Sequence, residues 1–128
     1  YDLAAKREEP IPVFAEMGSV NPVIVSAAAM EKRGKEIAQQ LAGSFNLEAG
    51  QFCTSPGIIF TVENDKLADF EKELVSANSQ IDEQCMLNQG IKQAFSKVKN
   101  DFISNSNITV LSEAGDKDGN MVAGIIVK

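Results

Sequence analysis

Residues 22–25, with the sequence PVIV, form an uninterrupted apolar run that decides the fold of this 128-residue chain. Such a run is typical of a strand that is covered on both faces of a parallel sheet. From Met30 to Phe45 the apolar residues follow a helical period, and charged residues occupy the other side. Residues 58–62, IIFTV, are rich in β-branched side chains and predict the next strand.

The alternation of strands and helices extends on both sides of this segment. Residues 11–14 predict a short strand, and residues 1–7 a helical stub that ends before Pro10. Further helices are predicted after Asn64-Asp65 and from 88–90, and further strands at 108–111 and 121–127. We therefore predict an α/β fold with a layered, largely parallel sheet and flanking helices.

Composition restricts the partners of the chain. Eighteen acidic and 12 basic residues leave a net charge of −6, which argues against nucleic acid and against an anionic membrane surface. No apolar run approaches the ~20 residues that a membrane-spanning helix needs, and the first residues show no signal-peptide pattern. We expect a cytoplasmic protein whose partners are small molecules and other proteins.

The chain has no histidine and two cysteines, Cys53 and Cys85. Two isolated cysteines make neither a disulfide scaffold nor a zinc site, so no metal is expected. Without imidazole, a Ser/His/Asp triad or a Cys/His pair is excluded within these residues.

Cys53 is the first candidate for chemistry, because residues 50–57 are rich in turn formers and place it on a loop. Functional groups concentrate on such loops. The alternative is a small buried apolar residue, which most free cysteines are. That alternative is favoured for Cys85, which lies beside Met86 and Leu87 without comparable glycines.

Glu16 is the second candidate, because it interrupts an otherwise uncharged run over residues 11–24. A carboxylate that is partly desolvated at the end of a buried strand suits a general base. The alternative is a glutamate that points into solvent.

The two candidates lie in segments that resemble known motifs. Residues 14–18, FAEMG, followed by Asn21-Pro22, resemble the glutamate motif of aldehyde dehydrogenases, and residues 50–56, GQFCTSP, resemble the cysteine motif of that family. The resemblance covers essentially the whole chain. It is closest to an NADP-preferring branch with the α-ketoglutaric semialdehyde (2,5-dioxovalerate) and fatty aldehyde dehydrogenases, although Ser19-Val20 replaces the common Gly-Lys.

The resemblance implies a mechanism. The Cys53 thiolate attacks an aldehyde, hydride passes to NADP or NAD, and Glu16 activates the water that hydrolyses the resulting thioester. The Cys53 N–H would be one oxyanion donor. The backbone of Met17 and Gly18 would approach the nicotinamide.

The resemblance also implies that residues 1–128 are a single partial catalytic domain. The dinucleotide-binding domain is absent, because no Gly-rich turn joins a strand to a helix. The fragment alone is therefore expected to be inactive and to form a homo-oligomer. Two alternatives stay open: a thiol-based redox module, which a reversible Cys53–Cys85 disulfide would indicate, and an inert structural or binding fragment.

Overall fold

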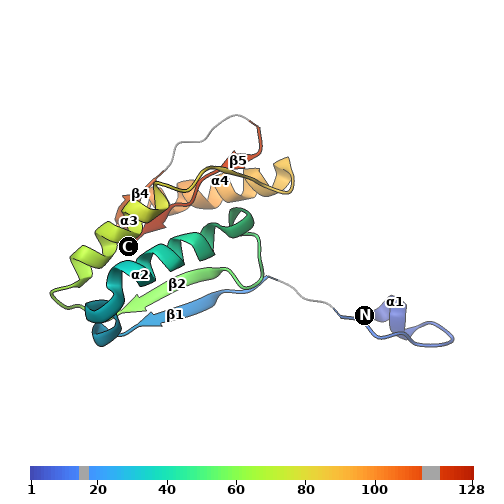
Figure 1. Cartoon of the computed structure of the whole chain (residues 1–128). Coiled ribbons are helices and arrows are strands. Elements are labelled where there is room, and N and C mark those ends of the chain that lie inside the picture. Colours follow the sequence, from blue (N-terminus) through green and yellow to red (C-terminus); the bar gives the residue numbers. More distant parts are fainter. Residues whose placement is uncertain (15–17, 114–118) are drawn as a thin grey trace.

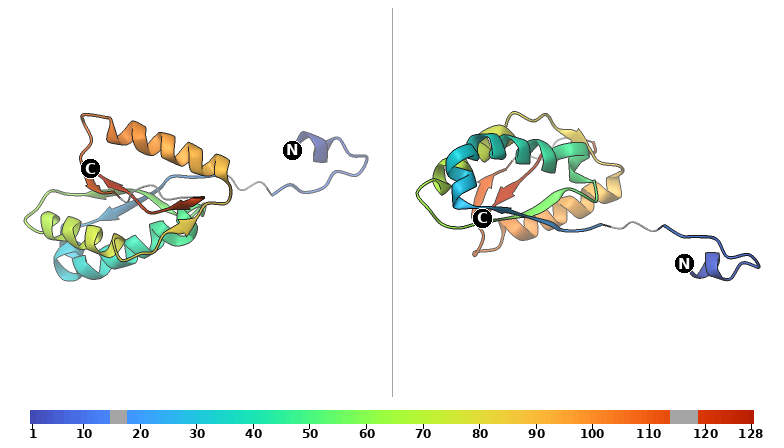
Figure 2. Two further views of the ribbon diagram at one scale, coloured as in Figure 1. Left: turned by 90° about the horizontal axis from the view of Figure 1, so that it is seen from above. Right: turned by 60° about the horizontal axis from the view of Figure 1, so that its bottom comes forward.

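The computed structural model describes residues 1–14, 18–113 and 119–128 (Figure 1). Its helices are α1 (Asp2–Ala5), α2 (Ala27–Asn46), the 3₁₀ helix η1 (Leu47–Gly50), α3 (Leu67–Asn78) and α4 (Gln89–Ile103). Its strands are β1 (Asn21–Val25), β2 (Pro56–Thr61), β3 (Gln84–Cys85), β4 (Val110–Ser112), β5 (Met121–Val122) and β6 (Ile126–Val127). Helix α1 buries no residue and lies apart from the other elements in all views (Figures 1 and 2).

Strands β1 and β2 form the parallel pair that the sequence predicts, with α2 as the crossover between them. Val23 is in register with Ile59, and Val25 with Thr61. The helix begins at Ala27 because the Ser26 hydroxyl accepts a hydrogen bond from the Ala29 N–H, at 3.3 Å. One strand–helix–strand unit therefore organises the N-terminal half of the described fold.

The other strands differ from the prediction of one largely parallel sheet. Among the described residues the strands form three two-stranded sheets, of which β3–β5 and β4–β6 are antiparallel. Residues 11–14 form no strand, since the prolines at 10 and 12 remove two backbone donors from this short segment. The predicted strand over 121–127 is divided, because β5 pairs with β3 whereas β6 pairs with β4.

Burial of β1 also differs from the expectation of a strand covered on both faces. Val23 and Val25 face the core, whereas Ile24 on the opposite face is 80% exposed. Phe60, its register partner on β2, is 52% exposed. In this structure the parallel pair is covered on the α2 side and presents apolar side chains on the other.

The core lies between this sheet and the pair of helices α2 and α3. Ala38 and Ala42 of α2 are almost fully buried, and their small side chains let α3 approach with Phe70 and Leu74. Burying such large side chains stabilises a fold by roughly 1.5–3 kcal/mol each. No described helix is long and apolar enough to cross a membrane.

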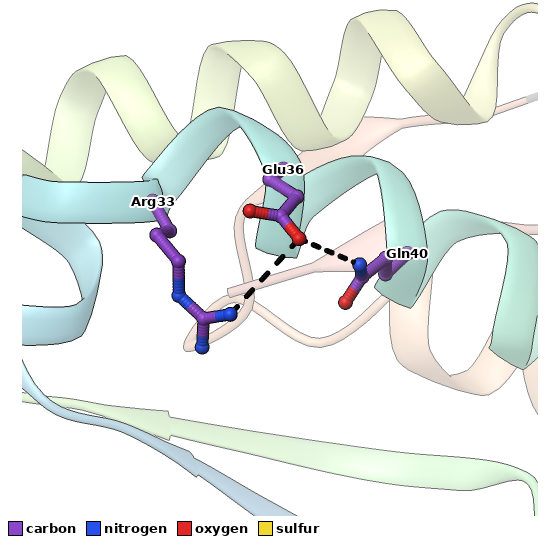
Figure 3. A network of polar contacts seen from close by, with 3 residues as sticks. All are labelled: Arg33, Glu36 and Gln40. Carbon is purple, nitrogen blue, oxygen red and sulfur yellow. Dashed lines mark hydrogen bonds and ion pairs between the residues drawn. The ribbon is translucent and has the colours of Figure 1, made fainter.

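Helix α2 is kinked at Arg33, whose φ of −142° and ψ of 23° are not helical. A surface network follows the kink (Figure 3): Arg33 Nη1 lies 4.0 Å from Glu36 Oε1, which accepts a 3.0 Å hydrogen bond from Gln40 Nε2. Exposed pairs of this kind contribute ~0–1 kcal/mol. The network therefore lies on the surface beside the kink and contributes little to its stability.

Two buried asparagines join the ends of α2 and α3 to the C-terminal strands. Asn46 Nδ2 donates to Asn78 Oδ1 at 2.8 Å, and Asn78 Nδ2 donates to the Gly124 carbonyl at 2.9 Å. Asn78 Nδ2 also lies 3.2 Å from Ser112 Oγ. Each asparagine is 7% exposed, so the loss of these bonds would leave polar atoms buried without partners.

Replacing Gly124 with alanine is expected to destabilise the fold by about 1–3 kcal/mol. A Cβ at Gly124 would lie 2.4 Å from Asn46 Oδ1 and 2.9 Å from Asn78 Oδ1, which forces both amides out of place. The measurement is urea unfolding followed by circular dichroism.

The matched control is Gly43→Ala. Gly43 lies within α2 and has no atom within 4 Å of its Cβ position. That alanine is expected to stabilise the helix by about 0.5–1 kcal/mol. Equal midpoints for the two variants would contradict the role given to the asparagine network.

Candidate functional site

Cys53 lies in a turn between η1 and β2, and its side chain is exposed. The turn is closed by a 3.0 Å hydrogen bond from the Ser55 N–H to the Phe52 carbonyl. The predicted loop position is confirmed, and the alternative of a buried apolar cysteine is wrong for Cys53.

Cys85 is also exposed, which contradicts the prediction that it is packed. The extended segment that contains β3 alternates: Met86 is 5% exposed and faces the core, whereas Leu87 is 79% exposed. Because successive side chains of such a segment point to opposite sides, Cys85 and Leu87 share the outer side. Exposure alone therefore does not distinguish the two thiols.

Glu16 and Met17 lie outside the described residues, so their predicted roles stay predictions. Gly18 is described and exposed, and no described atom lies within 4 Å of the position that a Cβ would take there. Its predicted cofactor contact also stays a prediction. Ser19 and Asn21, which follow Gly18, form hydrogen bonds to the Cys53 loop.

The Asn21 side chain contacts the Cys53 loop. Asn21 Nδ2 donates to the Cys53 carbonyl at 2.7 Å and to the Ser55 carbonyl at 3.1 Å. The Ser19 hydroxyl also donates to the Cys53 carbonyl, and lies 3.1 Å from Asn21 Nδ2. The structure thus brings the end of the glutamate motif against the cysteine motif across 32 residues of sequence.

The sequence did not identify this contact, although it contained a hint. Ser19 and Asn21 follow the glutamate motif and carry polar side chains on the approach to an apolar strand. A polar side chain at such a position needs a partner on a neighbouring strand or loop.

The entry to the Cys53 loop has an unusual backbone. Glu48, Ala49 and Gly50 have φ values of 49°, 57° and 71°, in the left-handed region that favours glycine. Non-glycine residues there cost of order 1–3 kcal/mol each, and such strain is concentrated at functional sites.

Two glutamines stabilise this strained entry. The Gln84 side chain accepts a 2.9 Å hydrogen bond from the Ala49 N–H. The Gln51 side chain donates to the Glu48 carbonyl at 2.7 Å and accepts from the Leu87 N–H at 2.8 Å. The β3 segment therefore contacts the entry to the loop, before the residues that Asn21 contacts.

The described residues offer no site for a metal ion, because they contain no group of three or more potential ligands of the His, Cys, Asp or Glu type. A hollow of about 700 Å³ lies between α2 and α3, lined by charged residues of both signs, and it does not include Cys53.

The structure is an α/β unit whose Cys53 thiol lies on an exposed loop that Ser19 and Asn21 contact. No family model matches the chain. Comparison with curated proteins gives the family. The α-ketoglutaric semialdehyde dehydrogenase of Acinetobacter baylyi is 43% identical over 95 residues, which are 74% of this chain and 18% of that protein.

A second relative, α-ketoglutaric semialdehyde dehydrogenase 2 of Azospirillum brasilense, is 41% identical over 93 residues, 73% of this chain and 18% of that protein. The chain belongs to the aldehyde dehydrogenase family. The matched part of the chain spans 18% of the length of each of these relatives.

Proposed function

We propose that this chain supplies the nucleophile and the water-activating carboxylate of an NAD(P)-dependent aldehyde dehydrogenase. The observation that carries the proposal is the contact of Asn21 with the Cys53 carbonyl, at 2.7 Å. Asn21 follows Glu16 by five positions, so this contact supports a position for the carboxylate near the loop that carries the thiol. The names of the two relatives support the oxidation of an aldehyde.

Cys53 performs the covalent step. Its thiolate attacks the aldehyde carbon, a C–S bond forms, and the carbonyl π electrons move to oxygen. Within the described residues the Cys53 N–H has no hydrogen-bond acceptor, so it is available to stabilise that oxyanion. Loss of hydride from the former aldehyde carbon converts the adduct into a thioester.

The nicotinamide cofactor, when bound, accepts this hydride. Met17 and Gly18 would contact this cofactor through their backbone, and no described atom lies within 4 Å of a Cβ position at Gly18. Glu16 then removes a proton from water, the water oxygen attacks the thioester carbon, and the Cys53 thiolate leaves. The product is the carboxylic acid.

The substrate is a semialdehyde or a fatty aldehyde, and the cofactor is NADP, or alternatively NAD. The two relatives are named for α-ketoglutaric semialdehyde, which makes that compound the first substrate to assay. We place the protein in the cytoplasm.

Residues 1–128 form part of a catalytic domain, and other residues supply the dinucleotide-binding domain. The short length relative to the two dehydrogenases supports this division. The apolar outer face of β1 and β2 would then be covered by other parts of the longer protein, or by a second copy in a homo-oligomer. The high exposure of Ile24 and Phe60 supports such a cover.

Acid quenching during turnover is expected to trap an acyl group on Cys53 and none on Cys85. The experiment uses a protein that joins these residues to a dinucleotide-binding domain, with α-ketoglutaric semialdehyde and NADP⁺. Peptide mass spectrometry locates the acyl group. Both thiols are exposed, so labelling by simple access would mark both.

The control is the same quench without NADP⁺, which should give no acyl group because the adduct is not oxidised. Acylation of Cys85 would contradict the proposal. A reversible Cys53–Cys85 disulfide without any thioester would favour the thiol-based redox module instead.

A further inference from the structure

The two prolines at the start of the parallel strands create a need for side-chain donors. Asn21 is in register with Pro56, and the register shifts between Asn21 and Pro22. Proline has no N–H, so neither Pro22 nor Pro56 can donate to the ladder where the strands begin. The carbonyls of the adjoining loop must find their donors elsewhere.

Asn21 provides these donors. Its amide nitrogen contacts the carbonyls of Cys53 and Ser55 on both sides of Thr54, and the Ser55 contact is half-buried. Ser19 adds a hydroxyl donor to the Cys53 carbonyl. Two side chains from one segment therefore fix the peptide group that follows the thiol-bearing residue.

We infer that Asn21, assisted by Ser19, is the positioning residue of the Cys53 loop. It touches neither substrate nor cofactor, and acts by fixing the Cys53 carbonyl and hence the direction of the Cys53 side chain. Gln51 and Gln84 stabilise the entry to the loop at Glu48 and Ala49, whereas Asn21 contacts the loop at Cys53 and Ser55. That this loop is used in catalysis rests on the proposed function; that Asn21 positions the loop is the additional inference.

The test measures the rates at which Cys53 and Cys85 react with dithiodipyridine in the folded chain, with peptide mass spectrometry to assign each thiol. Neither aldehyde nor nucleotide is present, so the result is independent of the proposed enzyme activity. Cys85 is the comparison thiol, because it is exposed and its contact with the loop, from Gln51 Nε2 to the Cys85 carbonyl at 3.5 Å, does not involve Asn21.

Asn21→Ala is expected to move the Cys53:Cys85 rate ratio at least about fivefold toward the ratio in denaturant, since each lost hydrogen bond changes an equilibrium by a factor of roughly 2–10. Asn21→Asp keeps the size but, when ionised, only accepts hydrogen bonds. It should therefore change the ratio more than alanine does. Gln40→Ala, which removes an exposed amide on α2, should leave the ratio unchanged.

A wild-type ratio in Asn21→Asp would overturn the inference, because Asn21 would then only fill space. An unchanged ratio in Asn21→Ala would overturn it as well. If Asn21→Ala does not fold, the exposed Ser19→Ala variant decides: a smaller shift in the same direction supports the inference, and no shift contradicts it.

Discussion

Glu16→Gln is expected to reduce steady-state aldehyde oxidation by ~10²–10⁴-fold, the usual effect of losing a general base. Glutamine has nearly the same shape but cannot take the proton of the attacking water. Thioester formation does not need that proton transfer, so a burst of reduced cofactor should survive while turnover falls. The measurement is stopped-flow absorbance of the reduced cofactor in a protein that includes the dinucleotide-binding domain.

Glu48→Gln is the matched control for the removal of one carboxylate near the thiol. Glu48 lies five positions before Cys53, and its carbonyl, not its side chain, contacts Gln51. The control should keep both burst and turnover. Loss of the burst in Glu16→Gln, together with a less reactive Cys53, would instead assign Glu16 to activation of the thiol.

Local patterns predicted the parts of the fold in which sequence neighbours decide the structure. The apolar period of α2 and the β-branched run of β2 are such parts, and both are confirmed. Asn88 was predicted at the start of a helix, and its side chain accepts a 3.0 Å hydrogen bond from the Ile91 N–H at the start of α4. These features depend on residues within one or two turns of each other.

Features set by distant residues could not be predicted. Residues 121–127 are apolar throughout, and only the change of partner from β3 to β4, with Gly124 against the two asparagines, divides them. The exposure of Cys85 likewise depends on which side of its segment meets the core. A strand pattern predicts that side chains alternate between two faces. It does not predict which face packs against elements that are far away in sequence.

In the candidate site, too, local features could be predicted and features set by distant residues could not. The turn formers around Cys53 predicted its loop, but no rule of composition gives positive φ to Glu48 and Ala49. The side chains of Gln51 and Gln84 stabilise that conformation, and Gln84 lies 35 positions from Ala49. Asn21 likewise gains its role only when β1 and β2 pair, because the pairing places two prolines where donors are needed.

The 128 residues alone are expected to fold and to show no aldehyde oxidation with NAD⁺ or NADP⁺. Folding is expected because α2, α3 and the β1–β2 pair already share a buried core. Activity is not expected, because no described element resembles a dinucleotide-binding turn, and positioning of a reactant can contribute ~7–11 kcal/mol to catalysis. These residues supply one predicted oxyanion donor, the Cys53 N–H, and the lack of a second donor would lower the rate by a further ~10²–10³-fold.

The assay combines absorbance of reduced cofactor, with short and long aldehydes, and size-exclusion chromatography. The apolar face around Ile24 and Phe60 should produce dimers or larger species, since exposed patches of this kind associate. Ile24→Lys, on that open face, should shift the chain toward the monomer without unfolding it. If aldehyde oxidation occurs and disappears in Cys53→Ala, these residues contain a complete enzyme, and the division into a partial catalytic domain and a separate dinucleotide-binding domain is wrong.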